Sequence, residues 1–374
     1  MKKGLALLLG LTLAMSVFTG CTSGGAEAPQ TSDAPAESAE APAESAEAPE
    51  SEAPAEEANA EGGGDLVIYS PNSEDMINVI VPLFEKETGI KVELISMGSG
   101  ELFTRVESEK NSPNADVAWG GGRATYYNNL GLFEDYTSAN NDSVMDEYKN
   151  DTNKITLYCL DGSCLLVNKD LTEGITIEGY ADLLNPELKG KISMGDPANS
   201  SSAFAQLTNM LLAMGGDYTS DAGWKYVEDL LVNTEGKIAS SSSQVHKSVA
   251  DGENAVALTY EDPAASYMKS GAENLEVVYP TEGSVYLPAG SGIIKGAKNM
   301  ENAKLFMDFI VSATGQDAFG TQLTVRPVSA NAALGDYMTP LSDIKLIYED
   351  YDYVQENKDA IVEHYMDLYT TIAE

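Results

Sequence analysis

The sequence predicts an α/β fold with a largely parallel sheet, in a body of residues 65–374 that is long enough for two lobes. Short apolar segments typical of strands alternate with segments that have helical spacing. Turns rich in Ser, Asn and Gly join them. The body contains no stretch of eighteen or more apolar residues, so the sequence predicts no membrane-spanning helix there.

Residues 1–20 have the pattern of a secretory signal peptide. Two lysines precede an apolar run that is too short to span a bilayer, and small residues come before Cys21. A cysteine at this place resembles the bacterial lipobox, in which it becomes the lipid-modified first residue. We therefore expect export and a lipid anchor at Cys21 on the outer face of the cell membrane, extracellular or periplasmic. Ordinary cleavage beside an incidental cysteine is the alternative.

Residues 21–64 consist almost entirely of Ala, Pro, Glu, Ser and Gly. A seven-residue unit recurs at 34–40 and 41–47, but each copy contains proline and no apolar residue larger than alanine, so it cannot form a coiled coil. The composition predicts a disordered acidic spacer between the lipid and the folded body.

The formal net charge is −37, and the spacer contributes eleven acids and no bases. The body therefore remains strongly acidic. This charge argues against nucleic acid or an anionic membrane surface as a partner, because binding polyphosphate needs clustered Lys and Arg. Contact with the membrane is expected through the lipid anchor only. A small anion remains a suitable ligand, because local N–H groups can bind it. We expect a monomer.

Three strand-like segments, each followed by a helix-like one, open the body. Ser73 is placed to cap the first helix, Gly89 to end it, and Pro82 should kink it. The strands are predicted over 66–69, 90–95 and 116–119, and the helices begin after residues 73, 100 and 123.

Cys159 and Cys164 lie in two apolar runs that Asp161-Gly162 separates. An Asp-Gly pair in this setting predicts a two-residue hairpin turn, which would place the cysteines opposite each other. Export would allow them to form a disulfide, although directly opposed cross-strand pairs are geometrically marginal, so free thiols are the alternative. Zinc binding is disfavoured, because no histidine lies nearby.

The turns after the first three strands are candidate ligand sites. Ligands bind at the carboxyl ends of strands in open α/β sheets, where helix N-termini offer free N–H groups and about half a positive charge. Helix capping alone is the structural alternative for each turn. Three such turns in register favour a site. The candidates are Ser70, Asn72, Ser99, Gly122 and Arg123.

Several segments together resemble a known family. Residues 67–92 resemble its first strand, helix and second strand, and 292–299 the strand and turn that re-enter the first lobe. The helix over 302–312, followed by Gly315-Gln316, is the most typical piece. The body, from Asp65 to about Arg326, resembles the extracellular solute-binding proteins of ATP-driven importers, in the cluster of ferric-iron, thiamine, phosphonate and sugar-phosphate binders.

The resemblance implies a two-lobed, periplasmic-binding-protein-like fold of type II. The first lobe would comprise 65–165 and 279–374, with C-terminal helices packed on it, and the second lobe 166–278. Hinge closure would trap a small solute for delivery to an importer permease. This function needs no cofactor and no chemical step. Consistently, the sequence has no nucleophile elbow, no metal-ligand motif and no base beside a plausible nucleophile.

Candidate ligand residues in the second lobe are polar and mostly uncharged. The candidates Asn199, Ser200, Ser201 and Ser202 follow a predicted strand, and their serines present hydroxyl and N–H groups suited to an oxyanion, or else cap a helix. The run 240–244 offers the same choice. Tyr260 and Glu261 end another strand, where an acid suits sugar hydroxyls or an amine.

Arg123 and Arg326 are candidate anchors for phosphate or phosphonate, with surface ion pairs as the alternative. These features favour an organophosphate or phosphonate, such as a sugar phosphate. Ferric iron or thiamine is the alternative. The resemblance implies a tyrosine pair near this position in iron binders, where this chain has Tyr260 alone. Tyr126-Tyr127 is a pair but lies on a predicted helix of the first lobe, and His246 and His364 match no iron-ligand position. We therefore expect no protein-built metal site.

Overall fold

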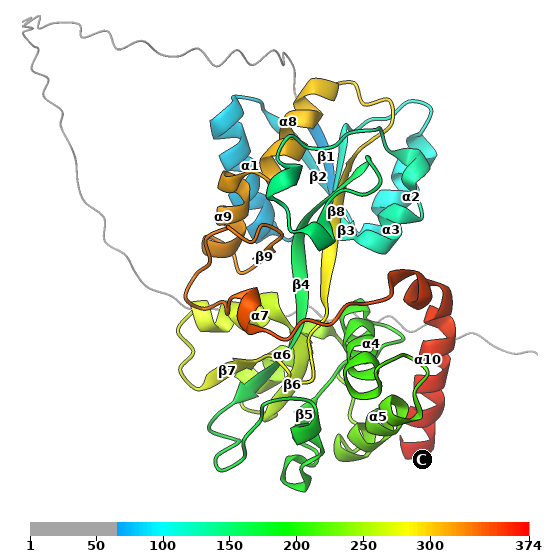
Figure 1. The fold of residues 1–374 in the computed structure, drawn as a ribbon, viewed down its shortest axis with the longest axis vertical. Helices are drawn as coiled ribbons and strands as arrows, with labels where there is room; N and C mark the ends of the chain where they lie inside the picture. Colours follow the sequence, from blue (N-terminus) through cyan, green and yellow to red (C-terminus); the bar gives the residue numbers. More distant parts are fainter. Residues whose placement is uncertain (1–65, 374) are drawn as a thin grey trace, which may run out of the picture. The chain divides into compact units, whose positions relative to one another are not determined.

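The computed structural model describes residues 66–373 (Figure 1). The signal peptide over 1–20, the lipidation site Cys21 and the spacer over 21–64 lie outside the described residues, so the expectations for them stay predictions. Within 66–373, no helix combines the length and hydropathy needed to cross a membrane.

The first lobe is built on a mixed sheet. Its strand order is β2-β1-β3-β8-β4, with β9 paired to β4. The pairs of β1 with β2 and β3 are parallel, as predicted, whereas each pair that β4 or β8 makes is antiparallel. The strands are β1 (Leu66–Ser70), β2 (Val92–Ser96), β3 (Val117–Gly122), β4 (Ile155–Asn168), β8 (Tyr286–Ile293) and β9 (Arg326–Pro327).

Helices cover both faces of this sheet (Figure 1). On one face Phe84 of α1 packs edge-on against Phe306 and Phe309 of α8, and on the other Phe103 of α2 packs against Tyr126 of α3. Burying such apolar faces is the main stabilising term of the lobe. The helices are α1 (Glu74–Thr88), α2 (Ser99–Glu109), α3 (Arg123–Tyr127), α8 (Met300–Ile310) and α9 (Ala313–Thr321).

The predicted ends of α1 are confirmed. The Ser73 side chain accepts a hydrogen bond from the Met76 N–H at 3.3 Å, and Gly89 ends the helix with φ of 74°. Only glycine adopts this left-handed conformation without steric cost. The helix continues through Pro82.

The second lobe is built on a smaller sheet in which β4 pairs with β6 and β7, and β6 pairs with β5. Leu165 and Leu258 face a core formed with α4 and α5, while Cys164 and Ala257 face the opposite core with α6. The elements are β5 (Ile192–Ser193), α4 (Ser201–Gly215), α5 (Asp221–Asn233), α6 (Ser242–Ala250), β6 (Val256–Tyr260), α7 (Glu261–Lys269) and β7 (Leu275–Val278).

Short 3₁₀ helices complete the connections. They lie at Leu130–Leu132, Asn141–Ser143, Asp146–Tyr148, Ala181–Leu184, Pro186–Leu188 and Leu341–Asp343.

Strand β4 corrects the hairpin prediction. It is one continuous strand of 14 residues that belongs to both sheets. Cys159 and Cys164 therefore lie about 16 Å apart along one strand, too far for a disulfide, and both are buried free thiols. Gly162 has a packing role instead of a turn role, because a Cβ there would lie 2.2 Å from Cε1 of Tyr286. The predicted hairpin and disulfide are wrong.

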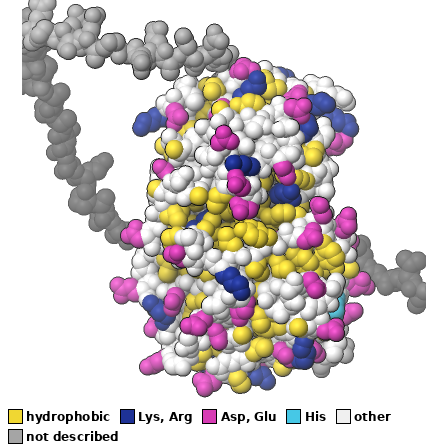
Figure 2. All heavy atoms as spheres, in the orientation of Figure 1, with side chains coloured by type: hydrophobic (Ala, Val, Ile, Leu, Met, Phe, Trp, Pro, Cys, Tyr) yellow, Lys and Arg dark blue, Asp and Glu magenta, His cyan; other side chains and the backbone are white. Residues whose placement is uncertain are grey.

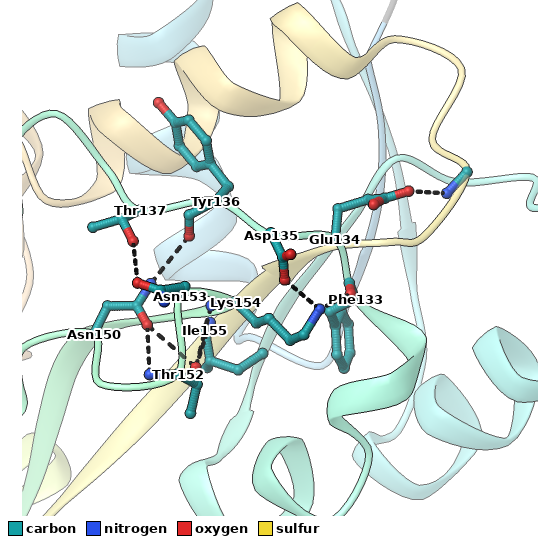
Figure 3. A network of polar contacts seen from close by, with 11 residues as sticks. Phe133, Glu134, Asp135, Tyr136, Thr137, Asn150, Thr152, Asn153, Lys154 and Ile155 are labelled. Carbon is teal, nitrogen blue, oxygen red and sulfur yellow. Dashed lines mark hydrogen bonds and ion pairs between the residues drawn. The ribbon is translucent and has the colours of Figure 1, made fainter.

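A polar network holds the chain where it enters β4 (Figure 3). The Lys154 ammonium donates to the Phe133 carbonyl at 2.9 Å and pairs with Asp135 at 2.6 Å. The Asn150 amide donates to the Tyr136 carbonyl at 3.1 Å, and its Oδ1 accepts from the Thr152 N–H at 3.1 Å. The crossing strand thus starts from a segment fixed in the first lobe.

The C-terminal helix α10 (Tyr351–Ala373) corrects a second expectation, because it packs on the second lobe. Ile361 and Tyr365 join the core that α4 and α5 form, and His364 stacks on Trp224 with ring centroids 3.9 Å apart. Just before the helix, Glu349 accepts a hydrogen bond from Thr208 of α4 at 3.0 Å. The helix therefore crosses back to the second lobe after the chain has returned to the first.

We expect Gly162→Ala to destabilise the fold by about 1–3 kcal/mol, because the added Cβ collides with the Tyr286 ring. Gly131→Ala is the matched control, since a Cβ at that position would meet no neighbouring atom within 4 Å. Urea unfolding of both variants measures the effect. Equal stability of the two would contradict the packing of Tyr286 on Gly162.

Burial raises the pKa of Glu349 to about 7. The folded state therefore holds a proton that the unfolded state releases near pH 4.5, so this group's contribution to stability falls as the pH rises through about 7. We expect Glu349→Gln to gain about 2 kcal/mol relative to wild type between pH 4 and pH 8. Glu356→Gln, on an exposed position of α10, makes the same change in charge as a control. A Glu349→Gln difference that is flat with pH would refute the assignment.

Candidate ligand-binding cleft

Asp161 marks the floor of a cleft between the two lobes. It is the one exposed residue of β4, whose other residues are all buried. The strand leaves the first sheet at Gly162, paired with Tyr286, and enters the second at Ser163, paired with Tyr260. Solvent therefore reaches the strand where it passes from one lobe to the other, which makes this crossing the candidate cleft.

On the first-lobe side, hydrogen bonds connect the turns after β1 and β3. This agrees with the prediction that the two turns lie at the same edge of the sheet. Ser70 Oγ and Asn72 Nδ2 donate to the Trp119 carbonyl at 2.8 and 3.1 Å. Asn72 Oδ1 accepts from the Tyr158 hydroxyl at 2.9 Å, and a Cβ on Gly120 would lie 2.7 Å from it. Ser70 is fully buried, so the structure gives it a structural role in place of the predicted ligand contact.

Ser99 and Gly122 lie at the same edge and are exposed. Ser99 begins α2 after Gly98, and Gly122 precedes α3. A Cβ on Gly121 would come within 3.9 Å of Ser99 Oγ, so the two turns are neighbours. Both residues stay candidates for contact with a ligand.

Arg123 lies between two aromatic rings. Its guanidinium carbon is 3.7 Å from the ring centroid of Tyr127 and 4.4 Å from that of Tyr351. Its Nη2 lies 3.8 Å from Asp151 Oδ2. Tyr351 begins α10, which packs on the second lobe, so Arg123 connects the lobes through a cation–π contact. Its predicted role as an anion anchor stays a prediction.

On the second-lobe side, two helix N-termini meet at a small recess. Ser200 caps α4 by accepting from the Ala203 N–H at 3.3 Å, and its Oγ lies 3.1 Å from that of Ser202. Ser241 caps α6 in the same way through the Gln244 N–H. The recess is lined by Gly195, Ser200, Ser202, Ala203, Ser242, Val245, Leu258, Thr259 and Tyr260.

Two of these lining residues carry unused hydrogen-bonding capacity. Thr259 Oγ1 is buried and has no hydrogen-bond partner among the described residues. Burial, with Asp161 and Asp262 nearby, raises the pKa of Tyr260 to about 12, so it remains a neutral phenol that can donate. The lining contains no charged side chain. The recess has a volume of only about 10 Å³, so these N–H and O–H donors could contact an oxyanion at its mouth but could not enclose one.

The other predicted residues of this wall lie outside the recess. Ser201 is the exposed first residue of α4, beside the lining serines. Asn199 is exposed, and its amide donates to Asp196 Oδ2 at 2.7 Å. Sequence reasoning had named the serine runs that contain the lining residues Ser202 and Ser242, but it did not single out Thr259.

Glu261 and Arg326 form a buried ion pair, each with a side chain 1% exposed. Arg326 Nε donates to Glu261 Oε2 at 2.9 Å, and the Tyr279 and Tyr286 hydroxyls donate to Oε1. The two charges neutralise each other inside the protein, so the structure gives Glu261 and Arg326 a pairing role, and their ligand roles stay predictions. The pair connects the start of α7 in the second lobe to β9 in the first lobe.

Residues 66–373 contain no group of three or more His, Cys, Asp or Glu side chains placed to hold a metal ion. A metal bound in the cleft would therefore need other ligands, such as tyrosine or a bound anion.

Removing one partner of the buried pair should cost about 3–5 kcal/mol, because it leaves an uncompensated charge. We expect this loss for Arg326→Met alone, and recovery of most of it when Glu261→Gln is added. Urea unfolding of both single variants and the double variant gives the coupling energy. Single losses below about 1 kcal/mol would contradict the role of the pair.

The fold agrees with comparisons to known proteins. The family model for bacterial extracellular solute-binding protein matches residues 80–344. The periplasmic binding protein AfuA of Actinobacillus pleuropneumoniae, solved with exogenous fructose-6-phosphate bound, is 29% identical, with a TM-score of 0.66, over 82% of this chain and 99% of that one. Iron uptake protein A1 of Synechocystis is 25% identical over 75% of this chain and 80% of its own.

The apo ferric ion-binding protein A of Pasteurella haemolytica is 20% identical, with a TM-score of 0.68, over 83% of this chain and 99% of that one, and it supports the fold alone. The family match spans most of the described residues and both lobes. The chain therefore belongs to the bacterial extracellular solute-binding proteins, which supply ABC importers with their solutes.

Proposed function

We propose that this protein binds a small organophosphate or phosphonate, with a sugar phosphate as the best candidate, and delivers it to an ABC importer permease. The recess where α4 and α6 begin carries the proposal. Its serine hydroxyls, the unpartnered Thr259 hydroxyl and the neutral Tyr260 phenol supply hydrogen-bond donors, and no residue that lines the recess is charged. This composition suits a phosphoryl group.

Two helix N-termini make this a stronger anion site than either alone. Each contributes free N–H groups and a partial positive charge, worth about 0.3–1 kcal/mol toward a nearby anion at an exposed site. The rest of the molecule is acidic, and Figure 2 shows acidic side chains spread over the visible face, with Lys and Arg scattered among them. A small local site of this kind remains compatible with the net charge of −37.

The arrangement of the lobes supports capture by closure. Strand β4 crosses between the sheets, and the chain returns between β7 and β8, so the cleft walls can rotate about a narrow hinge. The permease would then recognise the closed form. We propose that the protein acts as a monomer, held by a lipid at Cys21 outside the membrane, and that it binds its solute without chemical change.

Ferric iron or thiamine is the second candidate. Tyr260 and Asp161 are close enough to interact electrostatically, and an anion in the recess could complete an iron site with the tyrosine. The similarity to an iron uptake protein gives this alternative its weight.

Thermal unfolding of residues 22–374 tests the proposal. We expect glucose 6-phosphate or aminoethylphosphonate to raise the midpoint, since a ligand at a hundredfold over its Kd adds about 2.7 kcal/mol. Inorganic phosphate, thiamine and ferric citrate are the comparison ligands. A shift with thiamine or ferric citrate alone would overturn the proposal.

Ser242→Asp should abolish this shift, because it places a carboxylate in the recess at the first residue of α6. Thr314→Asp, an exposed change in the first turn of α9, adds the same charge elsewhere as the matched control. Retention of the shift in Ser242→Asp would exclude the recess as the phosphate site.

A further inference from the structure

We infer that Asp161 recognises the part of the ligand that lies beyond the phosphoryl group. Its carboxylate would accept hydrogen bonds from hydroxyl or ammonium groups, so the solute is an organophosphate with such donors, and inorganic phosphate is disfavoured. The inference rests on the proposed function and narrows its ligand class. It assigns a role to a residue that the sequence pattern placed in a turn.

The alternation of side chains brings Asp161 and the recess to one face of the second sheet. Ser163 is paired with Tyr260, and directly opposed residues in an antiparallel pair point to the same side. Asp161 lies two residues before Ser163 and so shares that side, about 6.6 Å along the strand. Tyr260, the partner of Ser163, lines the recess. The separation of Asp161 from the recess is therefore comparable to the span of a hexose phosphate.

Asp161 also lacks the protein partners that the buried carboxylates Glu261 and Asp116 have. Glu261 is paired with Arg326, and Asp116 accepts hydrogen bonds from the Val67 and Asn299 N–H groups at 3.0 and 2.9 Å. The Asp161 carboxylate makes no hydrogen bond or ion pair with any described residue. Its side chain keeps contact with solvent in the cleft, yet desolvation by the surrounding protein, together with Asp262 and Glu261, raises its pKa. Donors on a ligand would supply what the protein does not.

The carboxylate also opposes unsuitable ligands. A phosphoryl group at the recess would repel the ionised form of Asp161, whose pKa is already raised in its partly desolvated surroundings. Inorganic phosphate cannot offset this repulsion, because it has no sugar hydroxyl or ammonium group to place beside the carboxylate. A sugar or amino group on the Asp161 side can offset it. The pairing of the recess with Asp161 therefore selects for two-ended ligands.

Titration calorimetry of Asp161→Asn tests the inference, with glucose 6-phosphate, aminoethylphosphonate and inorganic phosphate as probes. We expect the Kd for the preferred organophosphate to rise at least about tenfold, while the affinity for inorganic phosphate stays equal or increases. Comparing the loss of affinity for glucose 6-phosphate with the loss for aminoethylphosphonate shows whether Asp161 binds hydroxyl or ammonium donors. Asp359→Asn, an exposed change on α10, is the charge-matched control and should leave all three affinities unchanged.

Thermal unfolding of Asp161→Asn and Asp161→Ala verifies that both variants fold. An unchanged organophosphate affinity in both would overturn the inference while leaving the proposed function intact, because wild type would still bind. Equal losses for organophosphate and inorganic phosphate would also overturn it, since Asp161 would then only shape the recess. If wild type binds neither organophosphate, the proposed function fails, and the inference with it.

Discussion

The architecture depends on one strand that belongs to two sheets. Strand β4 pairs with β8 on one side of Gly162 and with β6 and β7 beyond it, so the two lobes share a backbone hydrogen-bonded ladder. Beside the crossing, the buried Glu261–Arg326 pair joins α7 to β9. A charge pair that is costly to separate inside the protein keeps these two elements in contact beside the crossing.

This constraint also places the candidate binding groups. The turns after β1 and β3 form one wall of the cleft, and the starts of α4 and α6 form the other. Asp161 lies between them at the only exposed position of β4. A ligand with a phosphoryl group at one end and hydrogen-bond donors at the other matches this order of groups. The Arg123 side chain, held between Tyr127 and Tyr351, adds a contact between the first lobe and the C-terminal helix.

Local signals in the sequence predicted much of the fold. Ser73 and Gly89 identified the ends of α1 because capping depends on nearby backbone atoms. The serine runs at 200–202 and 240–244 identified two helix starts for the same reason. The pairing of Glu261 with Arg326 could not be predicted, because the residues are 65 positions apart and meet only through tertiary packing.

Asp161-Gly162 shows where such reasoning fails. The pair has the composition of a hairpin turn, yet the glycine is required by the Tyr286 ring and the aspartate faces the cleft. Likewise, the apolar spacing of α10 predicted a packed helix but could not say on which lobe it packs. In both cases the deciding contacts come from residues distant in the sequence.

A crystal structure of the protein with glucose 6-phosphate bound would test the central claim most directly. The account predicts the phosphoryl oxygens within hydrogen-bonding distance of Ser202, Ser242 and the first N–H groups of α4 and α6. It further predicts sugar hydroxyls that donate to Asp161. A phosphoryl group held instead by Arg123 in the first lobe, with the recess between α4 and α6 unfilled, would contradict the account.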